Sequence, residues 1–120
     1  MLEDDPKAEE TFWGPQKKAL EEYEATMKRL NLDGFVYPAV QETNIDETAL
    51  GARQDGPHSA TGWVNRIGVP AVVVQGGFYP DGLPFGLEIS GARWKDGELL
   101  GFAYSYEQAT HNRRLPKLKE

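Results

Sequence analysis

The stretch TGWVNRIGVPAVVVQGGFYPDGLPFGLEISG, residues 61–91, decides the fold of this chain. Ser59 or Thr61 can cap a short helix by accepting hydrogen bonds from its first backbone N–H groups. Gly68 can end that helix, because glycine adopts the left-handed conformation of a helix end without steric cost. The stretch therefore opens with a short helix.

The second part of the same stretch predicts an antiparallel hairpin. Residues 69–74 form a continuous apolar and mostly β-branched run, which is typical of a strand covered on both faces. Turn-forming residues at 76–82 separate this run from residues 83–90, where apolar and polar side chains alternate. We therefore expect two strands joined by a loop that is longer than the shortest hairpin turn.

A helix and a strand are predicted ahead of the hairpin. Residues 15–30 begin with Pro15, which suits a first helical position, and have apolar side chains at helical spacing at Leu20, Tyr23, Met27 and Leu30. Turn residues at 31–34 end this helix. Residues 35–37 then predict a short strand that stops at Pro38.

Two further segments complete the predicted order of elements. Residues 39–57 show little periodicity and predict a long loop. Asp96 is a suitable cap for a last helix, whose apolar side chains occupy more than one face and so need cover. The chain is therefore predicted to be of the α/β class, with the order α-β-loop-α-β-β-α. We divide it into a loose acidic leader, residues 1–14, and an α/β segment, residues 15–120.

Composition excludes several classes of function. The 120 residues include no cysteine, which excludes disulfides, thiolate nucleophiles and cysteine-based zinc sites. The net charge of -6 argues against binding to nucleic acid, which needs clustered cations. No apolar run is long enough to cross a membrane, and the acidic N-terminus does not look like a secretory signal. We therefore expect a cytoplasmic protein with no membrane partner.

The sequence offers no self-sufficient catalytic set. His58 and Ser59 are adjacent, but neighbouring residues rarely orient so that the imidazole reaches the hydroxyl. His111 lies four residues after Glu107, and this pair lacks the third ligand that a metal site needs. We predict no catalytic residue, no metal site and no cofactor. A small enzyme that uses His58 or His111 is the least favoured of the functions considered.

Four runs of sequence carry a resemblance to a known family. They are LDGFVYPA at 32–39, TGWVNRIGVPAVVV at 61–74, DGLPFGLEI at 81–89, and a last helix that ends in YEQAT at 106–110. In this order and spacing they resemble the C-terminal end of amidase signature family enzymes. The resemblance extends from residue 16 to residue 114, so that residues 15–120 are identified as a C-terminal amidase-like segment.

The resemblance implies a large mixed β-sheet flanked by helices, and hydrolysis of amide C–N bonds by a Ser-cis-Ser-Lys triad. In such enzymes the triad lies upstream of the portion matched here. We therefore expect this chain to be the C-terminal fragment of an amidase signature hydrolase that supplies sheet scaffold and pocket wall, and to be inactive alone. Its expected partners are the remainder of the amidase chain or a second copy, with a small-molecule amide as the substrate of the complete enzyme.

The resemblance also implies roles for particular residues. Asn65, Gly68, Pro70 and Ala71 match the N-x-x-G-x-P-A pattern of the family and are expected to place the helix end against the strand. Trp63, with His58 and Ser59 in the preceding loop, is expected to line the substrate pocket of a complete enzyme.

One alternative to the amidase fragment stays open. The chain could be a stand-alone, non-catalytic interaction module that pairs with another chain through an exposed sheet edge.

Overall fold

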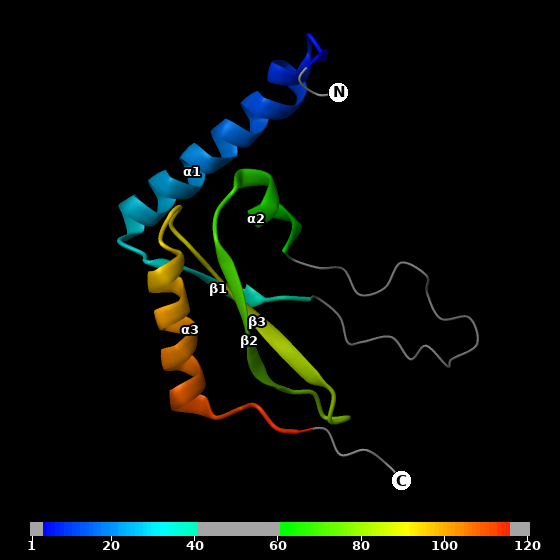
Figure 1. Cartoon of the computed structure of the whole chain (residues 1–120), viewed down its shortest axis with the longest axis vertical. Coiled ribbons are helices and arrows are strands. Elements are labelled where there is room, and N and C mark those ends of the chain that lie inside the picture. Colours follow the sequence, from blue (N-terminus) through cyan, green and yellow to red (C-terminus); the bar gives the residue numbers. More distant parts are fainter. Residues whose placement is uncertain (1–3, 41–60, 116–120) are drawn as a thin grey trace, which may run out of the picture.

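The computed structural model describes residues 4–40 and 61–115. Figure 1 shows their arrangement. A π-helical turn η2 (Glu9–Trp13) leads into the long helix α1 (Gly14–Leu30). The elements that follow are β1 (Gly34–Pro38), α2 (Gly62–Ile67), β2 (Ala71–Phe78), β3 (Pro84–Gly91) and α3 (Asp96–Thr110). The predicted order of helices and strands is confirmed. Most of the predicted loop at 39–57 lies outside the described residues.

The three strands form one sheet in the order β1-β3-β2, and both pairings are antiparallel. The predicted hairpin is therefore confirmed as the β2–β3 pair, whereas the mixed character expected of the sheet is not seen among these three strands. The predicted turn at 76–82 starts too early. Gly76 lies inside β2, where the register shifts between Gln75 and Gly77, so the extra residue is taken up as a bulge.

Helices cover the two faces of the sheet, which gives three layers. Side chains alternate between faces along a strand, so Phe35 and Ser90 point to one face while Val36 and Ile89 point to the other. On the first face, α1 and α2 pack around Phe35 with the buried side chains of Tyr23, Met27, Val64 and Val69. On the second face, α3 packs on the hairpin with the buried side chains of Val74, Ile89, Leu99 and Ala103.

Two glycines hold this arrangement for different steric reasons. Gly68 ends α2 with φ 71°, the left-handed conformation that the sequence predicted for it. Gly34 begins β1 against β3, where a Cβ atom would lie 2.1 Å from the Ser90 carbonyl oxygen. Any other residue at Gly34 would therefore push the two strands apart.

Three further sequence predictions need correction. Residues 69–74 were predicted to form a strand covered on both faces, but Val73, on the face opposite α3, is exposed because α1 and α2 do not extend over it. The N-cap of α3 is Lys95 rather than Asp96, which is the first helical residue. The acidic leader is not loose throughout, because its residues 9–13 are helical and continuous with α1. The division at residue 14 itself stays a prediction.

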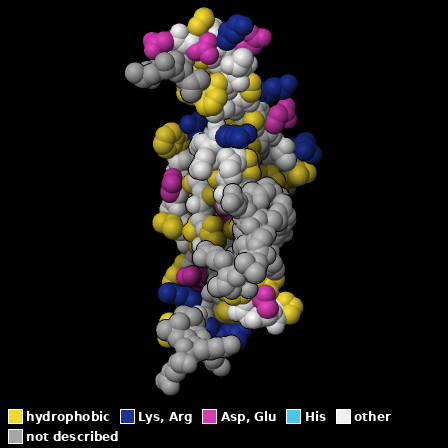
Figure 2. All heavy atoms as spheres, turned by 90° about the vertical axis from the view of Figure 1, so that its right-hand side faces the viewer, with side chains coloured by type: hydrophobic (Ala, Val, Ile, Leu, Met, Phe, Trp, Pro, Cys, Tyr) yellow, Lys and Arg dark blue, Asp and Glu magenta, His cyan; other side chains and the backbone are white. Residues whose placement is uncertain are grey.

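The N-terminal half of α1 stands clear of the sheet (Figure 1). Figure 2 shows Lys, Arg, Asp and Glu side chains of both signs gathered at this end of the molecule. One pair of them connects η2 with α1, since the Lys17 Nζ atom lies 2.7 Å from the Glu9 carboxylate. These charges suit a helical segment that water surrounds on most sides.

The helix α3 carries exposed apolar side chains on both flanks of its buried face. Leu100 and Tyr104 lie on one flank and Phe102 on the other, and all three are exposed, so the described part of the chain covers α3 on one side alone. Among the described residues, no helix is long and apolar enough to cross a membrane.

The packing of α3 predicts opposite outcomes for two adjacent leucines. The Leu99 side chain is 3% exposed and fills the space above Ile89, whereas that of Leu100 is 62% exposed. We expect Leu99→Ala to lower the free energy of unfolding by about 2–5 kcal/mol, because it leaves a cavity. Leu100→Ala should change it by less than about 0.5 kcal/mol. Urea unfolding followed by circular dichroism measures both, and similar losses would contradict this placement of α3.

Candidate functional site

A buried polar cluster lies on the sheet face that α1 and α2 cover. It consists of Tyr23 from α1, Tyr37 from β1, Trp63 from α2, and Glu88 and Ser90 from β3. The sheet register brings these side chains together, because Tyr37 pairs directly with Glu88 and paired residues point to the same face. The cluster therefore joins four separate elements at one point of the fold.

Two tyrosine hydroxyls donate hydrogen bonds within the cluster. The Tyr37 hydroxyl donates to the Glu88 carboxylate. The Tyr23 hydroxyl donates to the Gly91 carbonyl oxygen at 3.1 Å and lies 3.2 Å from the Ser90 Oγ atom. Glu88 is 2% exposed and Ser90 is 0% exposed. Burying a carboxylate without hydrogen-bond partners is costly. The Glu88 side chain can therefore be covered on this face because the Tyr37 hydroxyl bonds to it.

Trp63 closes the cluster with its indole ring. The ring lies 5.5 Å from that of Tyr23 and 5.7 Å from that of Tyr37, measured between centroids, and it is tilted against both. Such tilted pairs are the favoured geometry for aromatic rings. Trp63 itself is half-buried, so one part of its ring packs on the cluster while another part stays accessible.

Burial dominates the electrostatics of the two tyrosines. It raises the pKa of Tyr37 well above the usual value, and the hydrogen bond with Glu88 and the charge of Glu88 raise it further. Hydrogen bonds with Ser90 and Trp63 act in the opposite direction. Burial also raises the pKa of Tyr23, against a smaller opposite effect of its hydrogen bond with Ser90. Both hydroxyls therefore stay protonated and act as donors at neutral pH.

The geometry of the cluster suits support and shaping more than bond cleavage. The Ser90 hydroxyl is fully buried, so it cannot reach a substrate as a nucleophile. Within residues 4–40 and 61–115, no three His, Asp or Glu side chains gather as metal ligands would. What the cluster can do is hold the Trp63 ring and the end of α2 at a fixed position over the sheet.

The structure places some of the sequence-predicted site residues and leaves others untested. Trp63 lies in the polar cluster, while His58 and Ser59 lie outside the described residues. His111 ends α3, where its backbone N–H donates to the Glu107 carbonyl oxygen at 2.9 Å.

The N-x-x-G-x-P-A residues connect α2 to the sheet. Gly68 ends α2, the Pro70 carbonyl oxygen accepts a hydrogen bond from the Gly91 N–H at 3.1 Å, and Ala71 begins β2 opposite Ser90. Asn65 is exposed on α2. The roles expected of all four in a complete enzyme stay predictions.

Sequence reasoning missed most of the cluster. Periodicity treats Tyr23 and Tyr37 as apolar positions of a helix and a strand, and it treats Glu88 and Ser90 as the polar half of an alternating strand. One signal was present. The hairpin places Glu88 opposite Val73, inside an apolar run, so a partner for its carboxylate had to come from another element.

Comparisons with known proteins agree with the sequence resemblance. The chain is 36% identical to one subunit of the glutamyl-tRNA(Gln) amidotransferase of Alcanivorax borkumensis over 85 residues, which are 66% of this chain and 16% of that protein. It is 48% identical to the same subunit from Roseobacter denitrificans over 46 residues, which are 38% of this chain and 9% of that protein. No family model matches the chain.

Solved structures extend the match to almost the whole chain. The peptide amidase of Stenotrophomonas maltophilia superimposes with a TM-score of 0.70 and 27% identity, over 97% of this chain and 23% of that protein. The peptide amidase PAM bound to the competitive inhibitor chymostatin gives a TM-score of 0.71 and 28% identity, over 95% of this chain and 23% of that protein. The chain thus spans less than a quarter of the length of each of these relatives.

These matches define the chain as an α/β unit whose fold matches one part of the peptide amidase structures. The resemblance to the amidase signature family is confirmed, and the chain corresponds to part of an amidase signature domain.

The polar cluster predicts the effect of removing one hydroxyl. Tyr37→Phe keeps the ring but takes the donor from the buried Glu88 carboxylate, so we expect the free energy of unfolding to fall by about 1–3 kcal/mol. Tyr104→Phe is the matched control, because Tyr104 is 64% exposed on α3, and it should change the value by less than about 0.5 kcal/mol. Chemical unfolding measures both, and equal effects would contradict the bond to Glu88.

The raised tyrosine pKa values predict a loss of stability in alkali. Below about pH 10, Tyr37 is protonated in both the folded and the unfolded chain, so its contribution is fully present. Above that pH the unfolded chain loses this proton while the folded chain retains it, so the free energy of unfolding falls as the pH rises. The decline should be shallower in Tyr37→Phe than in the wild-type protein. Unfolding experiments across this pH range measure the two slopes. If the free energy of unfolding falls equally steeply with pH in both proteins, burial of Tyr37 is not the cause.

Proposed function

We propose that this chain acts within an amidase signature hydrolase, where it supplies sheet scaffold and one wall of the substrate pocket. The complete enzyme would hydrolyse an amide C–N bond, with the Ser-cis-Ser-Lys triad of the family contributed by protein outside the matched portion. One observation supports this most. The peptide amidase match covers 97% of this chain but 23% of the amidase, so the likeness is to one unit of a larger catalytic body.

Trp63 is the residue of this chain that we propose for substrate contact. Its ring is fixed on one side by Tyr23 and Tyr37 and is accessible on the other, which is the combination that a pocket wall needs. His58 and Ser59, which precede α2, are proposed to line the same wall. Asn65, Gly68, Pro70 and Ala71 are proposed to hold the end of α2 against β2, so that Trp63 keeps its place.

The partner that we propose is the remainder of an amidase, or failing that a second copy of this chain. The exposed apolar side chains of Leu100 and Tyr104, which lie on one flank of α3, and of Phe102 on the other flank support a covering partner, because they are uncovered on both sides of the buried stripe. We propose the cytoplasm as the location and a small-molecule amide as the substrate of the assembled enzyme.

A non-catalytic interaction module is the second candidate function. It is favoured by the sheet order, because β1 and β2 are the outer strands among the described residues. An outer strand can accept a strand from another chain through its backbone groups. This candidate would need a stable complex that has no hydrolytic activity.

Complementation of a known amidase tests the main proposal. The Stenotrophomonas maltophilia peptide amidase, without the segment that superimposes on this chain, is produced together with this chain and assayed for hydrolysis of a peptide amide. We expect turnover with both parts present and none with either part alone, because the scaffold and the catalytic residues would then be on separate polypeptides. Re-addition of the native segment of the amidase is the positive control.

Three outcomes would decide between the candidates. Turnover by this chain alone would contradict the proposed division of roles. Restored activity in the mixture would contradict the interaction module. A stable complex in native mass spectrometry that lacks turnover, while the native segment restores it, would favour the module over the amidase unit.

A further inference from the structure

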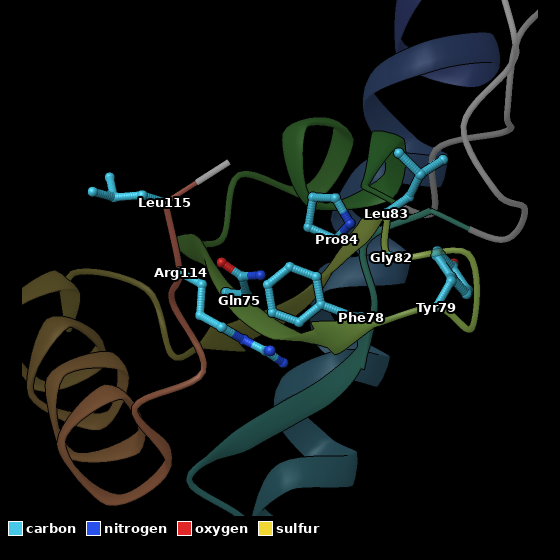
Figure 3. A pocket seen from close by; sticks show the side chains of 8 residues that line it. All are labelled: Gln75, Phe78, Tyr79, Gly82, Leu83, Pro84, Arg114 and Leu115. Carbon is cyan, nitrogen blue, oxygen red and sulfur yellow. The ribbon is translucent and has the colours of Figure 1, made fainter. Parts of the chain in front are cut away.

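A cavity of about 770 Å³ lies at the tip of the hairpin, away from the polar cluster. Its walls come from the end of β2, the turn, the start of β3 and the segment that follows α3. Figure 3 shows the side chains that matter here, which are those of Gln75, Phe78, Tyr79, Leu83, Pro84 and Arg114. The volume lies within the range of roughly 300–1,000 Å³ that is usual for small-molecule sites.

Hydrogen bonds fix the segment after α3 against β2. The Asn112 side-chain amide donates to the Gly76 carbonyl oxygen at 3.0 Å, at the bulge of the strand. The Tyr106 hydroxyl lies 3.5 Å from the same carbonyl oxygen. A side chain of α3 and one of the segment after it thus both contact the backbone at the bulge. Arg114, two residues after Asn112, is thereby brought over the hairpin.

Arg114 is the cationic group of this cavity. Its guanidinium carbon lies over the Phe78 ring at 4.3 Å from the centroid, which is the distance of a cation–π contact. A stacked guanidinium keeps its N–H groups free at the edge of its plane. Within the described part of the chain, no carboxylate pairs with Arg114, and of the eight lining residues it alone is charged. In the turn of the hairpin, the Asp81 carboxylate accepts a hydrogen bond from the Leu83 backbone N–H at 3.0 Å.

We propose that this cavity binds a small carboxylic acid with an apolar body. The planar edge of the Arg114 guanidinium matches a carboxylate through two parallel hydrogen bonds. Phe78, Tyr79, Leu83 and Pro84 offer an apolar lining for an aromatic or aliphatic body, and the Gln75 amide adds one polar contact. This inference rests on the cavity alone and does not depend on the proposed amidase function.

Calorimetric titration with a matched pair of compounds tests the proposal. The probes are N-acetylphenylalanine, which carries a carboxylate, and N-acetylphenylalanine amide, which has the same apolar body and no charge. We expect the carboxylate to bind roughly tenfold or more tightly than the amide, because only the carboxylate forms charge-assisted hydrogen bonds with Arg114. Equal affinities, or no binding of the carboxylate at millimolar concentration, would overturn the proposal.

Two arginine variants locate the site. Arg114→Gln should weaken binding of the carboxylate roughly tenfold and leave the weaker binding of the amide unchanged. Arg113→Gln is the matched control, because Arg113 lines the neighbouring cavity of about 210 Å³ with His111 and should alter affinity less than about twofold. Both side chains are exposed, so circular dichroism should report an unchanged fold. If the two variants weaken binding of the carboxylate equally, the loss comes from the change in net charge, and the proposed site at Arg114 is wrong.

Discussion

The bond between Tyr37 and the buried Glu88 is the interaction on which the rest of the fold depends. β3 is the central strand, and each of its faces must be covered by something. One face presents Leu87 and Ile89, which α3 covers without chemical difficulty. The other presents Glu88 and Ser90, which a plain apolar layer could not cover, because buried polar groups need partners. The two tyrosines solve this problem, one from the neighbouring strand and one from α1.

This requirement explains why α1 and α2 lie where they do. The Tyr23 hydroxyl bonds to Ser90 and to the Gly91 carbonyl oxygen from one face of the sheet. The helix α1 must therefore pass close enough to the end of β3 for this side chain to reach it. Trp63 then fills the space between the two tyrosine rings and fixes α2. Apolar packing of the neighbouring helix and loop side chains adds cohesion. The polar bonds select the register and the orientation, since an apolar contact alone tolerates sliding whereas a buried hydrogen bond does not.

Local patterns predicted the elements of this fold well. The helix at 15–30, the end of α2 at Gly68 and the hairpin all depend on periodicity or on turn residues that lie close together in the sequence. The cluster could not be predicted in the same way. An alternating strand assigns Glu88 to the wetter face, and only the packing of α1 and α2 over the sheet, beside the pairing of β1 with β3, makes that face an interior one. The bulge at Gly76 was not predicted either. Gly76 and Gly77 lie next to the turn, and glycine is as common in a turn as at a bulge, so the sequence did not separate the two.

The order of the strands has a consequence for how the chain reaches its native state. β2 and β3 are joined by a short turn, so their pairing needs the closure of a small loop. β1 pairs with the same β3 from 51 residues away, as measured between Tyr37 and Glu88. We therefore expect the hairpin to form early, with its Glu88 still hydrated, and β1 to join late in the slower step. The Glu88 carboxylate loses its water at that moment, so the step that completes the sheet is also the step that buries this side chain.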